Sequence, residues 1–325
     1  MRLFAIFMVL LFAHTTFANV VPANVLKTKQ EPASGKQEEY GNSIQIGTVV
    51  KTLKATTNEV PQNHDVALDP NTPSAWALGL SNRYLGLSLM ANVASGARDP
   101  SKVNTTAEDY QFRYFKEKIG VEFIYQKYKG FNQSAKSTAT DPFIDEAEYT
   151  LKDLSINMMQ LQFDWAFYGV SALDAFGATW EKPRQDGVAY YLLGGISELT
   201  ISNPTPFLPQ GTDSFGDDKT LTKGSFKTLT IGLGASYLWQ WTRFYAAIFA
   251  GAQGGPQKQE YQTVDTDWDN LKYVWSIQGK VVVGYDWGPW YVYMIGHTHP
   301  VTVNLKDTQM SFFSQDGGFY VGSRF

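Results

Sequence analysis

The chain contains no cysteine, no apolar run beyond its first residues that is long enough for a membrane-spanning helix, and no strong excess of one charge. The lack of cysteine excludes disulfides and thiolate metal sites. A formal net charge of −4 over 325 residues is mild, so we expect no nucleic-acid partner. After residue 18, no stretch approaches the roughly 20 apolar residues that a transmembrane helix needs. Any crossing of a membrane would therefore have to use strands.

Aromatic residues and glycine are abundant: the chain has 21 Phe, 18 Tyr, 9 Trp and 28 Gly. Residues 1–18 combine Arg2, an apolar run from Leu3 to Ala13 and the small-x-small sequence that ends at Ala18. This pattern predicts a secretory signal peptide that is cleaved after Ala18, with a buried N-terminal helix as the alternative. Together with the aromatic residues, the glycines and the lack of cysteine, the export signal indicates a protein of the bacterial outer membrane.

Four segments alternate with a period of two, and this periodicity predicts β-strands. One face of each segment is apolar, and the other is mostly polar or small. The apolar faces are Leu85, Leu87, Leu89, Ala91 and Val93; Ile119, Val121, Phe123 and Tyr125; Met159, Leu161, Phe163, Trp165 and Phe167; and Leu229, Ile231, Leu233, Ala235 and Tyr237. Strands of about ten residues are long enough to cross a bilayer at a tilt. A secreted soluble β-protein is the alternative, but its apolar faces would need a second sheet to cover them.

The sequence therefore predicts an all-β fold, a transmembrane antiparallel β-barrel of about twelve strands within a range of about ten to fourteen. The expected strands are 74–82, 83–94, 108–117, 118–129, 153–167, 170–182, 187–201, 223–238, 241–253, 270–286, 288–304 and 317–325. Aromatic residues near strand ends, among them Trp239, Trp241 and Trp287, would form girdles at the two membrane interfaces. We expect three regions: a signal peptide (1–18), a periplasmic linker with a possible first strand (19–65), and the barrel (66–325).

The last expected strand ends on Phe325, and we predict that it closes the barrel against the first strand. A terminal aromatic of this kind is similar to the signature that outer-membrane proteins present to the barrel-assembly machinery. Counted back from a periplasmic Phe325, the tight turns at 239–241 and 287–289 fall on the periplasmic side and the long connections 202–222, 254–269 and 305–316 fall outside. In the first half of the chain this order reverses, which indicates a missed or extra strand such as 44–53.

Four short motifs follow one another in a distinctive order: LDPN (68–71), YLGLSL (84–89), YKGF (128–131) and LLGG (192–195). On these motifs the chain resembles the uncharacterised bacterial outer-membrane proteins grouped as domain of unknown function 4421. The segment YGVSALDAFGATWEK departs from the family's pattern. The resemblance implies a barrel over roughly residues 66–325. It implies no catalytic residue, because the family has no established activity.

His297 and His299 form the most distinctive pair of polar residues, because residues two apart in a strand point to the same side. They could bind a metal, or act as the base of a lipid hydrolase with Ser311 or Ser314 as nucleophile. No third ligand or orienting acid stands at a diagnostic spacing, so a plain polar pair is the simpler interpretation. We predict no cofactor. The acidic run at Asp265, Asp267 and Asp269 lacks the glycine and glutamate of an EF-hand.

Seven charged or amide side chains are expected to line the lumen: Glu122, Gln160, Gln162, Asp164, Glu198, Lys280 and Asp286. Small residues on the inner face of the 223–238 segment would leave space beside them. We therefore expect a narrow, water-containing lumen and a passive pore with weak cation preference. An outer-leaflet lipid-modifying enzyme and a structural or surface-binding barrel are the alternatives. Membrane lipids are the expected surroundings, and the sequence does not indicate an oligomeric state.

Overall fold

The computed structural model describes residues 41–59, 64–72, 74–82, 87–94, 98–116, 118–137, 149–177, 186–208 and 215–325. All of them belong to one compact unit, Tyr40–Phe325. The expected signal peptide and the linker up to residue 40 lie outside the described residues, as do the first three residues of the YLGLSL motif. No helix in the described part of the chain has the length and apolarity to cross a membrane.

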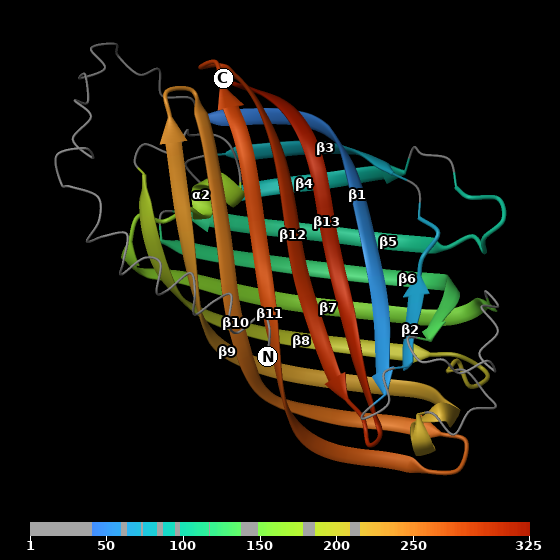
Figure 1. Ribbon diagram of the computed structural model, residues 1–325. Coiled ribbons are helices and arrows are strands. Elements are labelled where there is room, and N and C mark those ends of the chain that lie inside the picture. Colours follow the sequence, from blue (N-terminus) through green and yellow to red (C-terminus); the bar gives the residue numbers. More distant parts are fainter. Residues whose placement is uncertain are drawn as a thin grey trace. The chain divides into compact units, whose positions relative to one another are not determined.

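Thirteen antiparallel strands of the described residues form one sheet (Figure 1). They are β1 (Asn42–Glu59), β2 (His64–Asp69), β3 (Ala75–Asn82), β4 (Leu87–Ala94), β5 (Thr106–Lys116), β6 (Ile119–Ser137), β7 (Tyr149–Gly169), β8 (Gly187–Ser202), β9 (Leu221–Trp241), β10 (Phe244–Thr263), β11 (Asp267–Asp286), β12 (Trp290–Asn304) and β13 (Thr308–Arg324). Two short helices complete the fold, α2 (Leu173–Gly177) and the 3₁₀ helix η1 (Gly216–Thr220). The predicted all-β fold is confirmed.

The sheet closes because β13 pairs with β1 from Ser43↔Arg324 to Glu59↔Thr308. At the end of this seam, Asn42 and Phe325 exchange two backbone hydrogen bonds of 3.0 Å. The last strand therefore closes the barrel as predicted, but its partner is β1 and not the expected first strand, 74–82. Figure 1 shows the two strands side by side. β1 is the possible first strand of the segment 19–65, and it extends the barrel ahead of residue 66.

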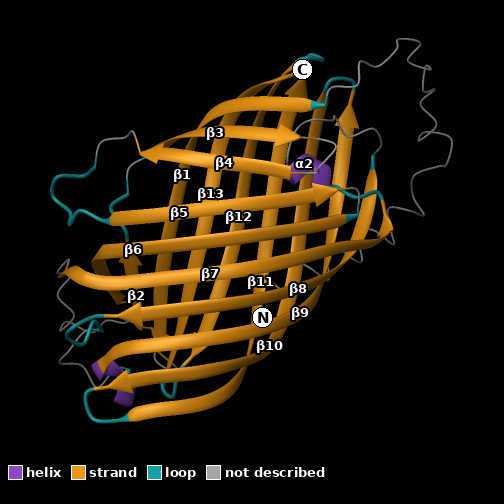
Figure 2. Cartoon of the chain, turned by 180° about the vertical axis from the view of Figure 1, so that it is seen from behind, coloured by secondary structure: helices purple, strands orange, loops and turns teal. Residues whose placement is uncertain are grey.

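The barrel has two ends, which we name by their connections. The turn end carries Asn42, Phe325 and the short turns 242–243 and 287–289; the loop end carries η1 and the turn 305–307. β2 and β3 run one after the other along β1. At the loop end β2 pairs directly with β6, whereas toward the turn end the hairpin β4–β5 lies between β3 and β6. The ring therefore has about ten strands at the loop end and two more at the turn end (Figure 2).

Residues 170–177, the described part of the expected strand 170–182, do not form a strand, so this prediction was wrong. Residues 173–177 form α2, whose first amide, from Leu173, donates to the hydroxyl of Ser171 at 3.2 Å. Ala172, Leu173 and Phe176 are buried, a spacing of one and four residues that suits a helix. Counting this segment as a strand reversed the direction assigned to every strand before it in the sequence. With α2 in its place, β3 and β5 both end on the side of Phe325, and the reversed order of turns disappears.

Two long connections expected at the loop end are largely strand. β10 continues to Thr263 and β13 begins at Thr308, so the turns span only 264–266 and 305–307. In both segments the alternation persists while the outward residues become polar, as at Lys258 and Glu260 in β10. These strand ends therefore extend beyond the apolar band. The connection between β8 and β9 remains long, as expected.

The outward face of the barrel is a band of exposed apolar side chains. Its members include Ile46, Leu78, Leu161, Phe163, Trp165, Ile196, Leu229, Ile231, Leu233, Ile248, Trp275, Val281, Met294 and Phe319. Near the turn end the band finishes in exposed aromatic residues, among them Trp241, Trp290 and Phe325. Contiguous exposed apolar surface of this kind is stable only in contact with lipid. The barrel spans a membrane.

Candidate functional site: a charged layer inside the barrel

The lumen is filled by three layers of inward side chains. An apolar cluster toward the turn end contains eight aromatic residues: Phe115, Phe176, Tyr191, Tyr245, Phe249, Tyr291, Tyr293 and Tyr320. A second cluster toward the loop end contains Tyr128, Phe131, Phe207, Phe215, Phe226, Tyr261 and Phe312. Between them lies a polar layer: along β12 the successive inward residues are Ile295, His297, His299 and Val301. The side chains of the central polar layer are almost fully buried, and the expected narrow, water-containing lumen stays a prediction.

Helix α2 lies within the turn-end cluster, where it contacts β5 and β11. The amide of Ala172, just before the helix, donates to the Tyr191 hydroxyl at 2.9 Å. The ring of Phe176 meets the ring of His297 edge to face, with 6.5 Å between ring centroids. The connection between β7 and β8 therefore reaches from the turn end to the polar layer.

The central charged layer comprises Arg113, Glu122, Asp164, Lys280, His297, His299 and Asp316, each at most 6% exposed. Backbone pairing between neighbouring strands places five of these residues in two rows. Arg113 lies opposite Glu122 on β5 and β6. On β11, β12 and β13, Lys280 lies opposite His297, which in turn lies opposite Asp316.

Ion pairs join the two rows. Lys280 bonds to Glu122, and its Nζ lies 3.0 Å from Asp164 Oδ2. Arg113 Nη2 lies 2.9 Å from Asp316 Oδ2. The Lys280 ammonium also lies 5.5 Å from the ring centroids of Phe115 and Phe249, at the boundary with the turn-end cluster. Such pairs hold strands that are not neighbours in the sheet, and they give each buried charge an oppositely charged partner.

The two histidines are buried beside these ions. His297 Nδ1 lies 2.8 Å from Arg113 Nη2 and 3.6 Å from Asp316 Oδ1. His299 Nε2 lies 3.6 Å from Glu122 Oε2. Ser314, one of the two predicted nucleophiles, lies directly opposite His299 on β13 and is fully buried. The acid that sequence spacing did not reveal is Glu122, which comes from the other row.

Five of the seven predicted lumen residues lie in the middle of the barrel: Glu122, Gln160, Gln162, Asp164 and Lys280. Asp286 is also buried, but it pairs with Arg324 at 2.8 Å at the turn end. The prediction for Glu198 was wrong. It lies opposite the outward residue Met159 and reaches Lys227 on the outer surface, 3.7 Å away. In β8 both faces contain aliphatic residues, so polarity does not indicate which one is inside.

Sequence reasoning missed Arg113 and Asp316. The segment around Arg113, EDYQFRYFK, mixes polar and aromatic residues on both faces, so its periodicity does not identify an inner side. Asp316 was assigned to a loop because the expected last strand began at residue 317. Continuing the alternation of Met310, Phe312 and Ser314 would have placed Asp316 on the inner face.

The seam between β11 and β12 is open over its loop-end half. Backbone pairing runs only from Gly279↔Thr298 to Asp286↔Tyr291, although β12 continues to Asn304. Hydrogen bonds of side chains take the place of the missing backbone pairs. The amide of Gly279 donates to the Thr298 hydroxyl at 3.1 Å, and Gln257 Nε2 donates to the carbonyl of Thr302 at 2.9 Å. Pro300 lies in the open segment, where its lack of an N–H is tolerated.

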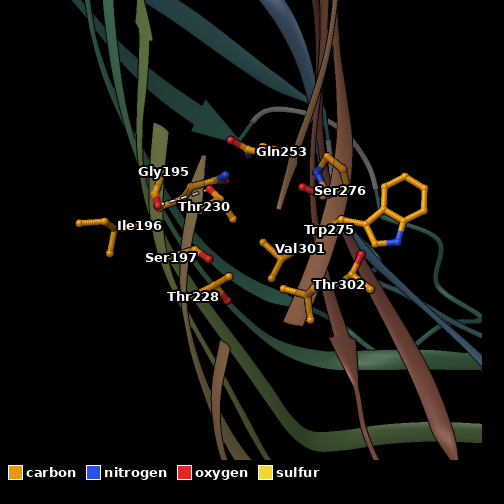
Figure 3. Close-up of a pocket in the computed structure, with 13 residues that line it drawn as sticks. Gly195, Ile196, Ser197, Thr228, Thr230, Gln253, Trp275, Ser276, Val301 and Thr302 are labelled. Atoms are coloured by element: carbon orange, nitrogen blue, oxygen red, sulfur yellow. Dashed lines mark hydrogen bonds between the residues drawn. The ribbon is translucent and has the colours of Figure 1, made fainter. Parts of the chain in front are cut away.

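A cavity lies directly behind this opening (Figure 3). Its empty volume is about 340 Å³, a figure that includes open solvent at its mouth. Ser197, Thr228 and Thr230 line one side and Ser276 and Thr302 the other, and Gln160 and Gln253 also contribute to a wall that is part polar and part apolar. Figure 3 shows the Trp275 indole pointing away from this space. Gln253 donates to Gln162 at 3.4 Å, and Gln162 donates to Asp164 at 3.0 Å, so amides link the cavity to the charged layer.

A closed antiparallel barrel with a lipid-facing band and a charged, filled lumen defines a transmembrane β-barrel. Within that class the chain belongs to the family described as a domain of unknown function (DUF4421), whose model matches residues 36–325. The resemblance inferred from the four motifs is confirmed. None of the curated proteins matches the chain.

Similar solved structures are proteins of bacterial outer membranes. The translocator domain of autotransporter NalP from Neisseria meningitidis has a TM-score of 0.40 and 14% identity, with 97% of this chain and 98% of that chain covered. Outer-membrane protease OmpT from Escherichia coli has a TM-score of 0.39 and 11% identity, covering 91% and 99%. The Pseudomonas putida toluene transporter TodX has a TM-score of 0.29 and 9% identity, covering 88% and 90%.

Proposed function

We propose that this protein is a gated conduit of the bacterial outer membrane for small polar solutes, and that its resting state is closed at the central charged layer. The predicted signal peptide and the lipid-facing band support the location. Short turns favour a periplasmic turn end and long connections an outward loop end. The surrounding lipids, and the assembly machinery that would bind the C-terminal strand, are the partners we expect.

The observation that carries this proposal is the charged layer itself. Buried ion pairs seldom stabilise a protein more than apolar side chains of the same size would. Ionisable residues at membrane depth are costly, and they commonly mark a pathway for ions or polar solutes. A barrel that served only as scaffold could continue its two apolar clusters through the middle. Here amide side chains instead link the charged layer to a cavity of mixed lining and to a side opening.

The proposed path runs from the open β11–β12 seam through the cavity and along Gln253 and Gln162 to the charged layer. Beyond that layer, α2 and the aromatic cluster would have to move for solute to reach the periplasm. The inward faces of the described strands carry four buried carboxylates (Glu122, Asp164, Asp286 and Asp316) and three buried cations (Arg113, Lys280 and Arg324). This balance favours small cations weakly over anions.

Planar-bilayer recording tests the proposal. The wild-type protein should be closed most of the time, with rare, small openings of weak cation preference. A variant that removes the Lys280 ion pairs, Glu122→Gln with Asp164→Asn and Lys280→Gln, should open much more often, because the Arg113–Asp316 pair is then the one described ion pair that still joins the two rows. The matched control is Glu198→Gln with Lys227→Gln, which removes an ion pair on the outer surface and should behave as wild type. Silence of the triple variant after verified insertion would refute the conduit.

A lipid hydrolase is the second candidate, and one arrangement favours it. Ser314, His299 and Glu122 lie in the order of a nucleophile, a base and an acid that orients the base. Ser314 is opposite His299 on the neighbouring strand, and His299 Nε2 lies 3.6 Å from Glu122 Oε2. The Ser314 hydroxyl has no hydrogen-bond partner among the described residues. A fluorophosphonate probe should then label the wild-type protein and the control Ser311→Ala but not Ser314→Ala. Unlabelled wild-type protein in a phospholipid membrane would remove this candidate.

A further inference from the structure

We propose that Glu122, His297 and His299 form a binding site for a divalent transition-metal ion of the zinc class. One ligand atom from each of the three residues lies within 4.8 Å of the others. All three side chains are at most 2% exposed. Two imidazoles and one carboxylate are a common ligand set for such ions and leave further positions for water.

Four of the polar atoms in this group make no hydrogen bond within the described part of the chain. Among the described residues, neither ring nitrogen of His299 makes a hydrogen bond, and the same is true of His297 Nε2 and Glu122 Oε2. Buried polar atoms are nearly always satisfied by protein, water or an ion. His299 Nε2 and Glu122 Oε2 face each other at 3.6 Å, which is too long for a hydrogen bond. Small side-chain movements would bring both onto a shared ion.

The neighbouring residues can support bound metal. Lys280 bonds to Glu122 Oε1, so the carboxylate is held, while Oε2 makes no hydrogen bond to a described residue and lies 3.8 Å from Arg113 Nε. For His297 to bind through Nε2, its Nδ1 must carry the proton, and Asp316 Oδ1 lies 3.6 Å away to accept it. Arg113 can only donate, so its present contact with Nδ1 must give way on binding. Arg113 would keep its ion pair with Asp316 Oδ2.

Charge and chemistry select the ion. With neutral histidines, the central charged layer carries three carboxylates against two cations, so one negative charge remains uncompensated. The imidazole ligands favour zinc-class ions over magnesium or calcium, which prefer oxygen. The metal would join β6 to β12 across the lumen, at the layer that the proposed conduit must open. The site stands on its own geometry and does not depend on conduction.

The test is metal binding to the folded, detergent-solubilised protein, purified with a tag that lacks histidine and stripped with EDTA. Zn²⁺ is titrated calorimetrically, and Co²⁺ is added to record its visible absorption. The variant is His297→Gln with His299→Gln, and the control is His64→Gln, the other histidine of the described residues. Wild type and control should bind one Zn²⁺ per chain, and Co²⁺ should give the intense absorption of a four- or five-coordinate site. The double variant should bind Zn²⁺ about 100-fold more weakly or worse. The loss of two direct ligands should cost at least as much affinity as changes to residues that only support the ligands.

Two results would overturn the site: no Zn²⁺ bound by folded wild-type protein, or equal binding by the double variant. Heat-modifiable gel migration shows whether each variant is folded. If the double variant does not fold, the Co²⁺ spectrum of the wild type decides alone, since a weak spectrum of a water-like six-coordinate ion contradicts imidazole binding. Because the measurement involves no current, a negative result leaves the conduit proposal standing, and a silent bilayer leaves the metal site standing.

Discussion

The two halves of the barrel on either side of the charged layer are built differently. Toward the turn end, every seam from β5 through β13 to β1 is paired, and tyrosine rings cover glycines in the wall: Tyr245 over Gly284, Tyr291 over Gly322 and Tyr320 over Gly318. Toward the loop end, β11 and β12 separate, and the cavity lies behind the gap. In the proposed conduit, the turn-end half would be the seal and the loop-end half the entrance.

The largest effect is expected where the halves meet. Lys280→Met would leave Glu122 and Asp164 buried without their cation, at a cost of about 3–5 kcal/mol in the free energy of unfolding. The matched change on the outer surface, Lys227→Met, removes the partner of Glu198 and should cost about 0–1 kcal/mol. Urea unfolding in detergent, followed by tryptophan fluorescence, measures both. Similar costs for the two variants would mean that the charged layer does not hold the halves together.

A smaller effect tests the seal. A Cβ added at Gly284 would lie 2.2 Å from the Tyr245 ring, so Gly284→Ala must displace that ring. We expect a loss of about 1–3 kcal/mol from overpacking. Gly194 is the control, because a Cβ there meets nothing within 4 Å. Gly194→Ala should change stability by no more than about 0.5 kcal/mol. The same unfolding assay applies, and a tolerated Gly284→Ala would argue against a rigid turn-end half.

The smallest effect concerns the loop end, where η1 is tied to the turn 305–307. The amide of Asp307 donates to Asp218 Oδ2 at 2.7 Å, and burial raises the pKa of Asp218 to about 6. Because the folded pKa is raised, this group contributes stability that is fully present below about pH 4 and is lost as the pH rises through about 6. Protease cleavage of the 203–220 connection should therefore increase across that range.

Asp218→Asn should abolish that pH dependence, since the amide keeps an acceptor but cannot ionise. Asp217→Asn is the control. A hydrogen bond from Lys306 lowers the pKa of Asp217, so its contribution is lost only as the pH falls below the ordinary range of a carboxyl. An unchanged cleavage profile in Asp218→Asn would assign the pH dependence to another group.

The outward face of the barrel could be predicted from sequence because its environment is uniform. Lipid requires an apolar side chain at every second residue, so the assignments in β6, β7 and β9 follow from alternation alone. The strand count was also close, since the error at 170–182 and the uncertain strand at 44–53 compensated for each other. Alternation did not identify the inner face where both faces of a strand have a mixed composition. Both faces of β8, which carries Glu198, contain aliphatic residues, and both faces of the segment around Arg113 contain aromatic residues.

The inner arrangement could not be predicted, because a sequence pattern does not tell which inward residues meet across the lumen. Glu122 is 175 residues from His297 in sequence. Their proximity depends on the closure of β13 on β1 and on the stagger of every seam between them. For the same reason, the sequence does not indicate that α2 and tyrosines from distant strands form one cluster inside the barrel.

Thiol labelling tests most directly whether the charged layer separates an entrance from a seal, because the chain has no cysteine of its own. Ser276→Cys places a thiol in the cavity, and Ser236→Cys places one in the turn-end half, where the native hydroxyl lies 2.9 Å from that of Tyr191. A charged, membrane-impermeant methanethiosulfonate reagent is applied to folded protein in vesicles. We expect Ser276→Cys to react and Ser236→Cys to stay unlabelled until the protein is unfolded. Equal rates at the two positions would contradict a barrel that is closed at its charged layer.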